Sequence, residues 1–337
     1  MAASEVGVDF DYTYNGKLSS DVLFCPSIDT PAISDFFKIF PQNKYKVQIP
    51  LLLPLSKIVK AYTSCARTFT DGIDITNTTL ELSELEINME WCKDDFEGLV
   101  GNVLSEEWLR SGVDEFNPEG TQIQRIIDQH VSDAARRDTF RIFSFGDTSD
   151  PNADYNQLDG MWTKLIANSG TGSAYCVRRT SDIAGVLAEG AALTALQEAY
   201  TNSAIVLKQL PASMKYFAVT GSVYENLMAS YESNANGTER QFTNLVMGQD
   251  SLTYRGIPVI AVYAWDSALA DPDNPLFGRT NLILYTTKDN HAVGVDVEGD
   301  ATKISGWYER KDRRYYIEGF QRLGYNYLCC DLQTIAY

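Results

Sequence analysis

Residues 85–96 read Leu-Glu-Ile-Asn-Met-Glu-Trp-Cys-Lys-Asp-Asp-Phe, and the first seven alternate strictly between apolar and polar side chains. This period of two is typical of a β-strand with one buried and one solvent-facing side. Just upstream, Leu80 and Leu82 have the opposite parity, so the register breaks near Ser83, where a bulge or bend is expected. The sequence therefore predicts a long strand over residues 78–91 with one interruption.

A second alternating stretch precedes this strand. Residues 44–60 alternate polar and apolar side chains at their start, and the polar segment 61–77 contains the turn signal Asp71-Gly72. Together the two strands predict one long β-hairpin. Because a hairpin without its own core is marginal in water, we expect it to lie on a neighbouring surface. Residues 1–43 show no sustained period and predict an extended arm with one short helix near 33–39.

The longest predicted helix covers residues 121–144. It begins with a Thr-x-x-Gln capping pattern, continues with apolar residues at helical spacing, and ends near Gly146. At the standard rise such a helix is roughly 36 Å long, longer than most globular helices. We expect it to be the spine of its domain.

The sequence changes character twice after this helix. An acidic loop at 147–159 leads into helical patterns and strands up to residue 265, which is typical of an α/β unit. From residue 282 onward short strands dominate, among them 315–320 and 326–330. The chain as a whole is therefore predicted to be α+β. The helical patterns of the α/β unit lie at 156–168, 181–188, 190–208 and from Ser222.

Composition excludes several classes of protein. Of the 337 residues, 44% are hydrophobic and 22% are charged, as in a folded protein and unlike a disordered or collagen-like chain. The net charge of −17 disfavours a general nucleic-acid binder. No run of about 18 apolar residues occurs, and the N-terminus lacks a signal-peptide pattern. We therefore expect synthesis in the cytosol and no membrane contact.

Six cysteines and two histidines limit the possible metal chemistry. The cysteines form no Cys-x-x-Cys pair, so a structural zinc site is not expected. Thiols of cytosolic proteins are kept reduced, and we therefore predict six reduced cysteines. They occupy positions 25, 65, 92, 176, 329 and 330.

Each candidate catalytic or cofactor motif fails at a required position. Asp150 to Asp154 resembles the start of a calcium loop, but Tyr155 replaces the required glycine. Gly170-Thr-Gly172 lacks the final glycine of a dinucleotide fingerprint. His130 is expected to pack near the apolar stripe of the long helix, and His291 to lie in a turn. No catalytic residue, cofactor or metal is therefore predicted, although the 45 acidic residues leave a carboxylate-pair hydrolase as an alternative.

Charge is distributed unevenly along the chain. Residues 81–119 hold twelve acidic and two basic residues, whereas residues 301–337 hold six basic and four acidic ones. Either the acidic segment is a solvated face, or the two segments are complementary patches on neighbouring copies that set their orientation. The candidate inter-subunit contacts are Glu84, Glu86, Glu90, Asp94, Asp95, Arg310, Lys311, Arg313 and Arg314.

The order of these segments resembles the major capsid proteins of tailed phages, with the Hong Kong 97-type fold that encapsulin shells share. The resemblance spans residues 40–337 and implies an α+β fold with four parts: an N-terminal arm at 1–43, an extended β-hairpin loop at 44–91, a peripheral domain at 92–146 and 266–337 that holds the spine helix, and an axial α/β domain at 147–265. It rests on Val47-Gln-Ile-Pro50, the acidic strand from Leu85, Ala134-Ala-Arg-Arg-Asp138, the segments Tyr216–Leu227 and Leu252–Val259, and the ending Glu309–Tyr325.

The resemblance also implies a function. It implies a structural protein and not an enzyme, one that assembles with itself into hexamers and pentamers of an icosahedral shell. That shell would enclose a double-stranded DNA phage genome without sequence-specific binding, with portal and scaffolding proteins as partners. The expected location is the virion capsid, after assembly in the host cytoplasm. An encapsulin-type compartment with the same fold is the first alternative.

Overall fold

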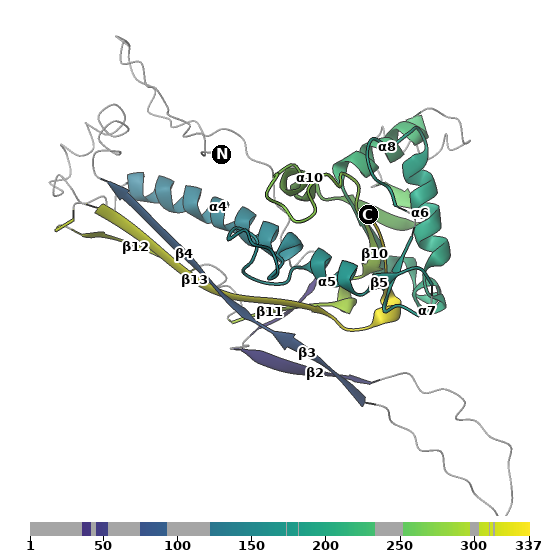
Figure 1. The fold of residues 1–337 in the computed structure, drawn as a ribbon, viewed down its shortest axis with the longest axis horizontal. Helices are drawn as coiled ribbons and strands as arrows, with labels where there is room; N and C mark the ends of the chain where they lie inside the picture. Colours follow the sequence, from purple (N-terminus) through teal and green to yellow (C-terminus); the bar gives the residue numbers. More distant parts are fainter. Residues whose placement is uncertain are drawn as a thin grey trace, which may run out of the picture.

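A computed structural model of the chain describes residues 36–41, 45–52, 75–92, 122–172, 174–180, 182–232, 252–296, 303–309, 311–312 and 314–337. These residues form an elongated molecule with three parts (Figure 1). A long helix lies along a five-stranded sheet, a seven-stranded sheet lies beside it, and a two-stranded hairpin projects from the first sheet. Most of the predicted N-terminal arm and the predicted turn at Asp71-Gly72 lie outside the described residues.

Strand β13 (Arg314–Tyr327) is the centre of the five-stranded sheet. It pairs antiparallel with β4 (Ser83–Cys92), with β12 (Lys303–Glu309) and with β11 (His291–Val295), and β11 pairs parallel with β1 (Lys38–Phe40). Two separate strands were predicted in this part of the sequence. They form one strand because β4 and β12 pair with its first part and β11 with its last, which keeps the middle extended. Residues 38 and 39, which belong to the helix predicted at 33–39, are held in strand β1 by their pairing with β11.

The predicted long hairpin is shorter than expected. Strand β2 (Lys46–Leu52) pairs with β3 (Ile75–Glu81), whereas β4 leaves the hairpin and pairs with β13 over its whole length. The predicted break in register is confirmed, since Leu82 separates β3 from β4. The second half of the acidic strand is therefore part of the sheet and not of the projecting hairpin.

The predicted spine helix is confirmed as α4 (Gln122–Phe145), with 24 residues. It ends at Gly146, whose N–H donates to the Ile142 carbonyl at 2.8 Å. A glycine is needed there because a Cβ atom would lie 2.3 Å from the Leu158 carbonyl oxygen. On its inner side, Phe140 and Phe143 are buried, which holds the helix along the sheet.

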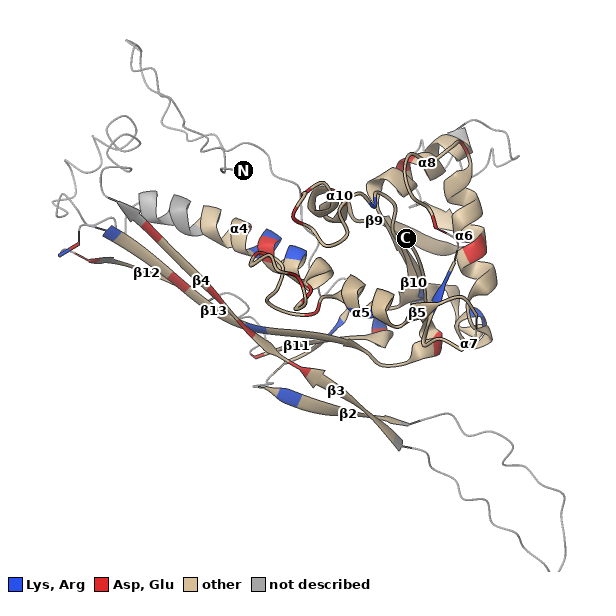
Figure 2. Ribbon diagram, viewed as in Figure 1, with Lys and Arg blue, Asp and Glu red and all other residues tan. Residues whose placement is uncertain are grey.

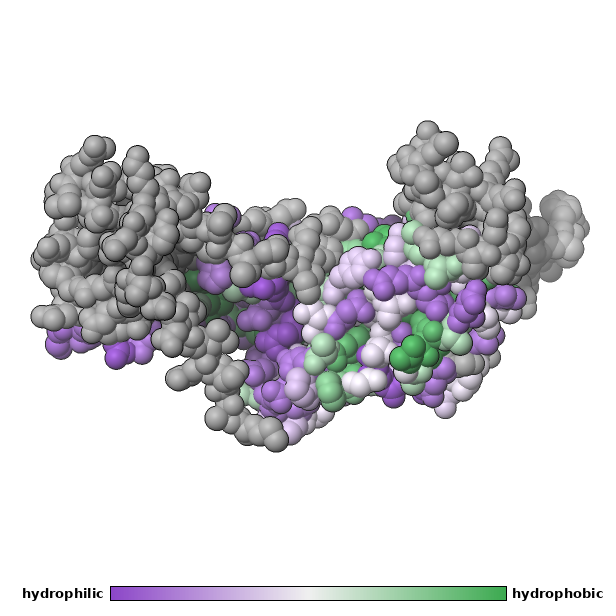
Figure 3. Space-filling model, turned by 90° about the horizontal axis from the view of Figure 1, so that it is seen from above, coloured by the Kyte–Doolittle hydropathy of each residue, from purple (hydrophilic) through white to green (hydrophobic). Residues whose placement is uncertain are grey.

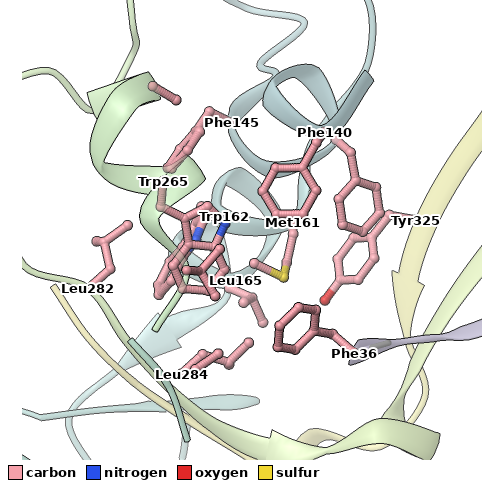
Figure 4. Packing of buried hydrophobic residues seen from close by; sticks show 14 of the residues in the cluster. Phe36, Phe140, Phe145, Met161, Trp162, Leu165, Trp265, Leu282, Leu284 and Tyr325 are labelled. Carbon is pink, nitrogen blue, oxygen red and sulfur yellow. The ribbon is translucent and has the colours of Figure 1, made fainter. Parts of the chain in front are cut away.

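One hydrophobic core joins α4 to both sheets through α5 (Met161–Ala167) and α10 (Tyr263–Leu269) (Figure 4). Trp162 and Trp265 meet edge to face with ring centroids 5.4 Å apart. Phe36 and Phe37 enter the same core next to strand β1, and the Phe37 ring lies 5.4 Å from that of Phe143. At roughly 1.5–3 kcal/mol for each large apolar side chain buried, this cluster is the main source of stability.

The seven-stranded sheet has the order β5-β6-β14-β10-β7-β9-β8. A second core covers it, formed with α6 (Ala191–Asn202) and α8 (Gly221–Glu232), and in it Phe217 stacks on Tyr285 with centroids 4.4 Å apart. The remaining elements are β5 (Ser169–Gly170), β6 (Val177–Arg179), α7 (Ile205–Gln209), β7 (Lys215–Val219), β8 (Thr253–Tyr254), β9 (Ile257–Ala261), β10 (Ile283–Thr287) and β14 (Gln333–Ala336).

Three details of this part differ from the expected pattern. The helix predicted at 190–208 is two helices, because Ser203 and Ala204 have extended backbone with ψ of 158° and 151°. The described residues of the helix predicted at 181–188 are not helical. Strands β10 and β14 join this sheet although they come from the segment 266–337, which the resemblance assigns to the peripheral domain. The domain boundaries themselves stay a prediction.

Cys176 and Cys330 form a disulfide bond, with their Cα atoms 4.6 Å apart and a sequence separation of 154. The prediction of six reduced cysteines is therefore wrong for this pair. The two residues meet because Cys176 directly precedes β6, and β6 runs parallel to β14, which begins three residues after Cys330. The neighbouring Cys329 is a free thiol. The structure describes no side chain for the cysteines at 25, 65 and 92.

Candidate assembly surface

Four of the candidate contact residues, Glu84, Glu86, Glu90 and Arg314, fall on one side of the five-stranded sheet. The register places Glu84 opposite Arg322 and Glu90 opposite Tyr316, so the even-numbered residues of β4 and β13 share a face. The odd-numbered residues Tyr315 and Ile317 are 2% and 1% exposed and point to the core. We call the even-numbered side the outer face. It comprises residues 84, 86, 88 and 90 of β4, the even residues 314–322 of β13, and the neighbouring residues 305, 307 and 309 of β12.

Acidic and basic residues alternate with uncharged ones along β4 and β13 (Figure 2). Three candidates on the outer face, Glu84, Glu90 and Arg314, already have partners within the chain. Arg322 donates from Nε and Nη2 to Glu84 at 3.0 and 2.8 Å, and from Nη1 to Asp296 at 2.9 Å. Arg314 pairs with Glu90 in the same way, across β13 and β4. These pairs hold β4 against β13 and offset part of the negative charge of the acidic strand.

Of the other candidates, the structure describes two. Glu86 and Lys311 are exposed. Asp94, Asp95, Arg310 and Arg313 lie outside the described residues. The structure therefore brings Glu84, Glu86 and Glu90 together with Arg314 on one face.

Aromatic side chains share this face with the charges, and the sequence analysis did not single them out. Trp307 lies opposite Tyr316 in the register and stacks on it with centroids 5.8 Å apart. Phe320 is 46% exposed, and the Arg322 guanidinium lies 5.1 Å from its ring centroid. Exposed aromatic residues and arginines are the residue types enriched where proteins associate. The signal for them in the sequence was parity: Tyr316 and Phe320 are an even number of residues apart and so lie on the same side of their strand.

The projecting hairpin borders the outer face. Lys46 on β2 forms an ion pair with Glu81 on β3, and the Lys46 ammonium group lowers the pKa of that carboxyl. Tyr45, at the start of the hairpin, is 64% exposed, and its ring lies 4.9 Å from the Arg322 guanidinium. The hairpin and the outer face therefore form one continuous surface of mixed aromatic and charged character.

A groove of about 360 Å³ lies between α4 and α10, and its charged groups are used in structural contacts. Arg141 lies 3.4 Å from Asp138 and 4.6 Å from the ring centroid of Tyr155. The Tyr155 hydroxyl in turn donates to Asp271 at 2.9 Å, and burial raises the pKa of Tyr155. Arg141, Asp138 and Asp271 in this groove are therefore engaged in contacts within the chain.

The two histidines lie where the sequence did not predict them. His130 is exposed on α4 and does not pack in the apolar stripe. His291 is not in a turn; it begins β11 and is fully buried, with ring nitrogens 2.6 Å from the Tyr325 hydroxyl and 2.8 Å from Thr286 Oγ1. Burial lowers the pKa of His291 to about 3, so the ring is neutral and serves packing.

Further features bear on the class of protein. Within the described ranges, no group of three or more His, Cys, Asp or Glu side chains is arranged to hold a metal ion. No helix in that same part of the chain is long and apolar enough to cross a membrane. On the face seen from above in Figure 3, hydrophobic residues form small patches among hydrophilic ones. Contacts on that face would thus combine polar and apolar groups.

No protein-family model and no curated protein matches the sequence. The structure, however, is similar to solved capsid chains. The capsid of the native GTA particle matches with a TM-score of 0.60 at 13% identity, over 100% of this chain and 99% of that one. The chain has a phage-capsid fold. The capsid of the Myoviridae phage XM1 matches with a TM-score of 0.59 at 12% identity, over 95% of both chains.

A third capsid chain, that of the cyanophage P-SCSP1u, matches with a TM-score of 0.56 at 12% identity, over 96% of this chain and 93% of that one. The likeness covers nearly the full length of each chain. This confirms the predicted fold at the level of a capsid protein with mixed helices and strands.

Proposed function

We propose that this protein is a major capsid protein that assembles with itself into the hexamers and pentamers of an icosahedral shell around double-stranded DNA. The observation that carries the proposal is the full-length likeness to capsid chains. A second observation supports it: among the residues of β2 and β3 whose side chains are described, 46–51 and 76–81, only Leu80 is buried. Such a hairpin is marginal alone and gains stability from a neighbouring copy.

The finer features of the proposal follow the same resemblance. Residues 1–43 would be the arm, 44–91 the extended loop, 92–146 with 266–337 the peripheral domain, and 147–265 the axial domain. The shell would enclose DNA without sequence-specific binding, in keeping with the net charge of −17. Portal and scaffolding proteins would be partners. Assembly would occur in the host cytoplasm, and the mature protein would reside in the virion.

The purified protein is expected to form rings or closed shells, because a repeated head-to-tail contact closes into rings. Size exclusion with light scattering, followed by negative-stain electron microscopy, measures this directly. A compact monomer that persists even with co-expressed assembly partners would contradict the proposal. Shells that carry a protein cargo instead of DNA would favour the encapsulin alternative, and a monomer with hydrolytic activity would favour the hydrolase.

We also propose that charges of the acidic strand and the basic cluster contact neighbouring copies. Reversing the charge of Arg314 alone does not isolate a contact between copies. Arg314→Glu disturbs the in-chain pair with Glu90 and the proposed contact with a neighbouring copy at the same time. The pair is exposed and should contribute only about 0.2–1 kcal/mol to the subunit fold. Exchanging the two charges separates the effects, since the double variant keeps the in-chain pair and reverses the charge that a neighbour meets.

We expect Arg314→Glu to lower the yield of particles at low salt, with partial recovery at high salt because salt screens surface charges. We expect the exchanged variant, Glu90→Arg with Arg314→Glu, to recover the unfolding midpoint and not the yield. Denaturant unfolding of the subunit and quantitative electron microscopy give the two readouts. Full recovery of particles by the exchange would show that the pair acts only within the chain.

A further inference from the structure

Strand β3 crosses over the five-stranded sheet at two glycines that lie directly opposite each other. Gly294 of β11 and Gly324 of β13 are register partners. At both glycines, the side on which a Cβ atom would lie faces the crossing chain. A Cβ atom at Gly324 would lie 2.1 Å from the Glu81 carbonyl oxygen. A Cβ atom at Gly294 would lie 2.8 Å from Leu80 Cδ2. A side chain at Gly324 would collide with the backbone of the crossing chain, and one at Gly294 would press on the ends of the Leu80 and Leu82 side chains.

The crossing explains why the apolar residues change parity along this part of the chain. Leu80 and Leu82 point down onto the outer face at the glycines, and Leu80 is 0% exposed. Beyond Leu82 the chain drops to the side of β13, where Leu85 points to the inner core and is 6% exposed. The break in register thus marks the point where the chain changes from lying above the sheet to lying within it.

Hydrogen bonds on both sides secure the crossing. Asn326, two residues after Gly324, donates from Nδ2 to the Thr79 carbonyl at 2.7 Å. The Leu82 N–H donates to the Tyr45 carbonyl at 2.8 Å, which closes the base of the hairpin. We call this contact of Gly294 and Gly324 with residues 79–82 the seat of the hairpin. Farther along the hairpin, residues 46–51 and 76–78 are exposed or half-buried.

We propose that Gly294 and Gly324 are positioning residues that set the direction in which the β2–β3 hairpin leaves the subunit, so that it reaches a second copy of this chain. The inference rests on the proposed function for the identity of the partner. The structural part of the inference does not depend on the identity of the partner. The hairpin is attached to the sheet at the seat, and its direction depends on how closely the backbones of β3 and β13 approach each other there. A small shift of the β3 backbone at the seat therefore becomes a larger displacement farther along the hairpin.

The two glycines are expected to respond differently to substitution. At Gly324 the added methyl group meets the backbone of Glu81, which no side-chain truncation relieves. At Gly294 it meets the ends of the Leu80 and Leu82 side chains, at 2.8 and 3.0 Å. Leu80→Val removes the nearer atom and offsets the volume of the new methyl group, a kind of exchange that cores tolerate best.

The test compares Gly324→Ala, Gly294→Ala and each of these combined with Leu80→Val, beside Leu80→Val alone. Hydrogen exchange of the free subunits reports on residues 75–82, and electron microscopy reports on assembly. We expect exchange in that segment to be at least about tenfold faster in both glycine variants, with β13 still protected and with few or misshapen shells. Leu80→Val should restore Gly294→Ala and leave Gly324→Ala unchanged.

Unchanged exchange at residues 75–82 in Gly324→Ala would overturn the inference, because the hairpin would then not depend on close approach at the seat. Equal rescue of both glycine variants would also overturn it. If Gly324→Ala does not fold, the comparison of Gly294→Ala with its rescued form still decides. Failure of the unaltered protein to form shells would count against the proposed function alone, since the exchange experiment uses subunits.

Discussion

Replacing Cys330 by serine is expected to lower the free energy of unfolding of the oxidised protein by about 2–4 kcal/mol. The bond between Cys176 and Cys330 closes a loop of 154 positions, and such a loop restricts the unfolded chain strongly. In the folded state the bond joins the segment just before β6 to the segment before β14. Denaturant unfolding with and without reductant measures the change.

Matched variants separate the disulfide from the loss of a sulfur atom. Cys329→Ser alters the adjacent free thiol and should change the unfolding free energy by less than about 0.5 kcal/mol. Reductant should destabilise the unaltered protein and Cys329→Ser, and should have no further effect on Cys330→Ser. Alkylation before reduction should leave Cys176 and Cys330 unlabelled. Full labelling of both residues in the folded, air-oxidised protein would contradict this expectation.

Local patterns predicted the elements of this fold better than the contacts between them. The spine helix and the break near Ser83 follow from periodicity, which depends only on neighbouring residues, and both are confirmed. The disulfide depends on residues 154 positions apart, and the compartment rule for cytosolic thiols gave the opposite answer. Pairings across a fold are set by topology, which a single sequence does not display.

The candidate surface shows the same division. Alternation along residues 84–90 correctly separated the exposed carboxylates from Leu85. It did not show that Arg322 and Arg314 would pair with Glu84 and Glu90 within the chain, because the register of β4 on β13 joins segments more than 220 residues apart. Charge totals over a segment identify a surface, but they leave open whether its partner lies in the same chain.

Acid is expected to destabilise the subunit through His291. The Thr286 hydroxyl donates to the Leu332 carbonyl at 2.9 Å, so His291 Nε2 must donate to Thr286, and Nδ1 accepts from the Tyr325 hydroxyl. Every polar atom of the neutral ring is thus satisfied. A second proton would have to enter on Nδ1, facing the Tyr325 hydroxyl in the core between the sheets, where burial lowers the pKa of His291 to about 3.

The direction of the effect follows from the two states of the ring. The unfolded histidine takes up its proton near pH 6.5, whereas the folded one does so near pH 3. The stabilising contribution is therefore complete above pH 6.5 and is lost as the pH falls toward 3. Relative to pH 8, the loss from this residue should be on the order of 2 kcal/mol at pH 5. Urea unfolding of free subunits across this pH range measures it.

The decisive quantity is a difference in slope, because many carboxyl groups also titrate at low pH. His291→Gln cannot take up a proton, so its unfolding free energy should fall less steeply between pH 8 and pH 5 than that of the unaltered protein, although it starts from a lower value. His130→Gln is the control, since His130 is exposed on α4. Equal slopes for His291→Gln and the unaltered protein would mean that the buried ring gains its proton as easily in the folded chain as in the unfolded one. The neutral, hydrogen-bonded junction between β10, β11 and β13 would then not be a source of acid sensitivity.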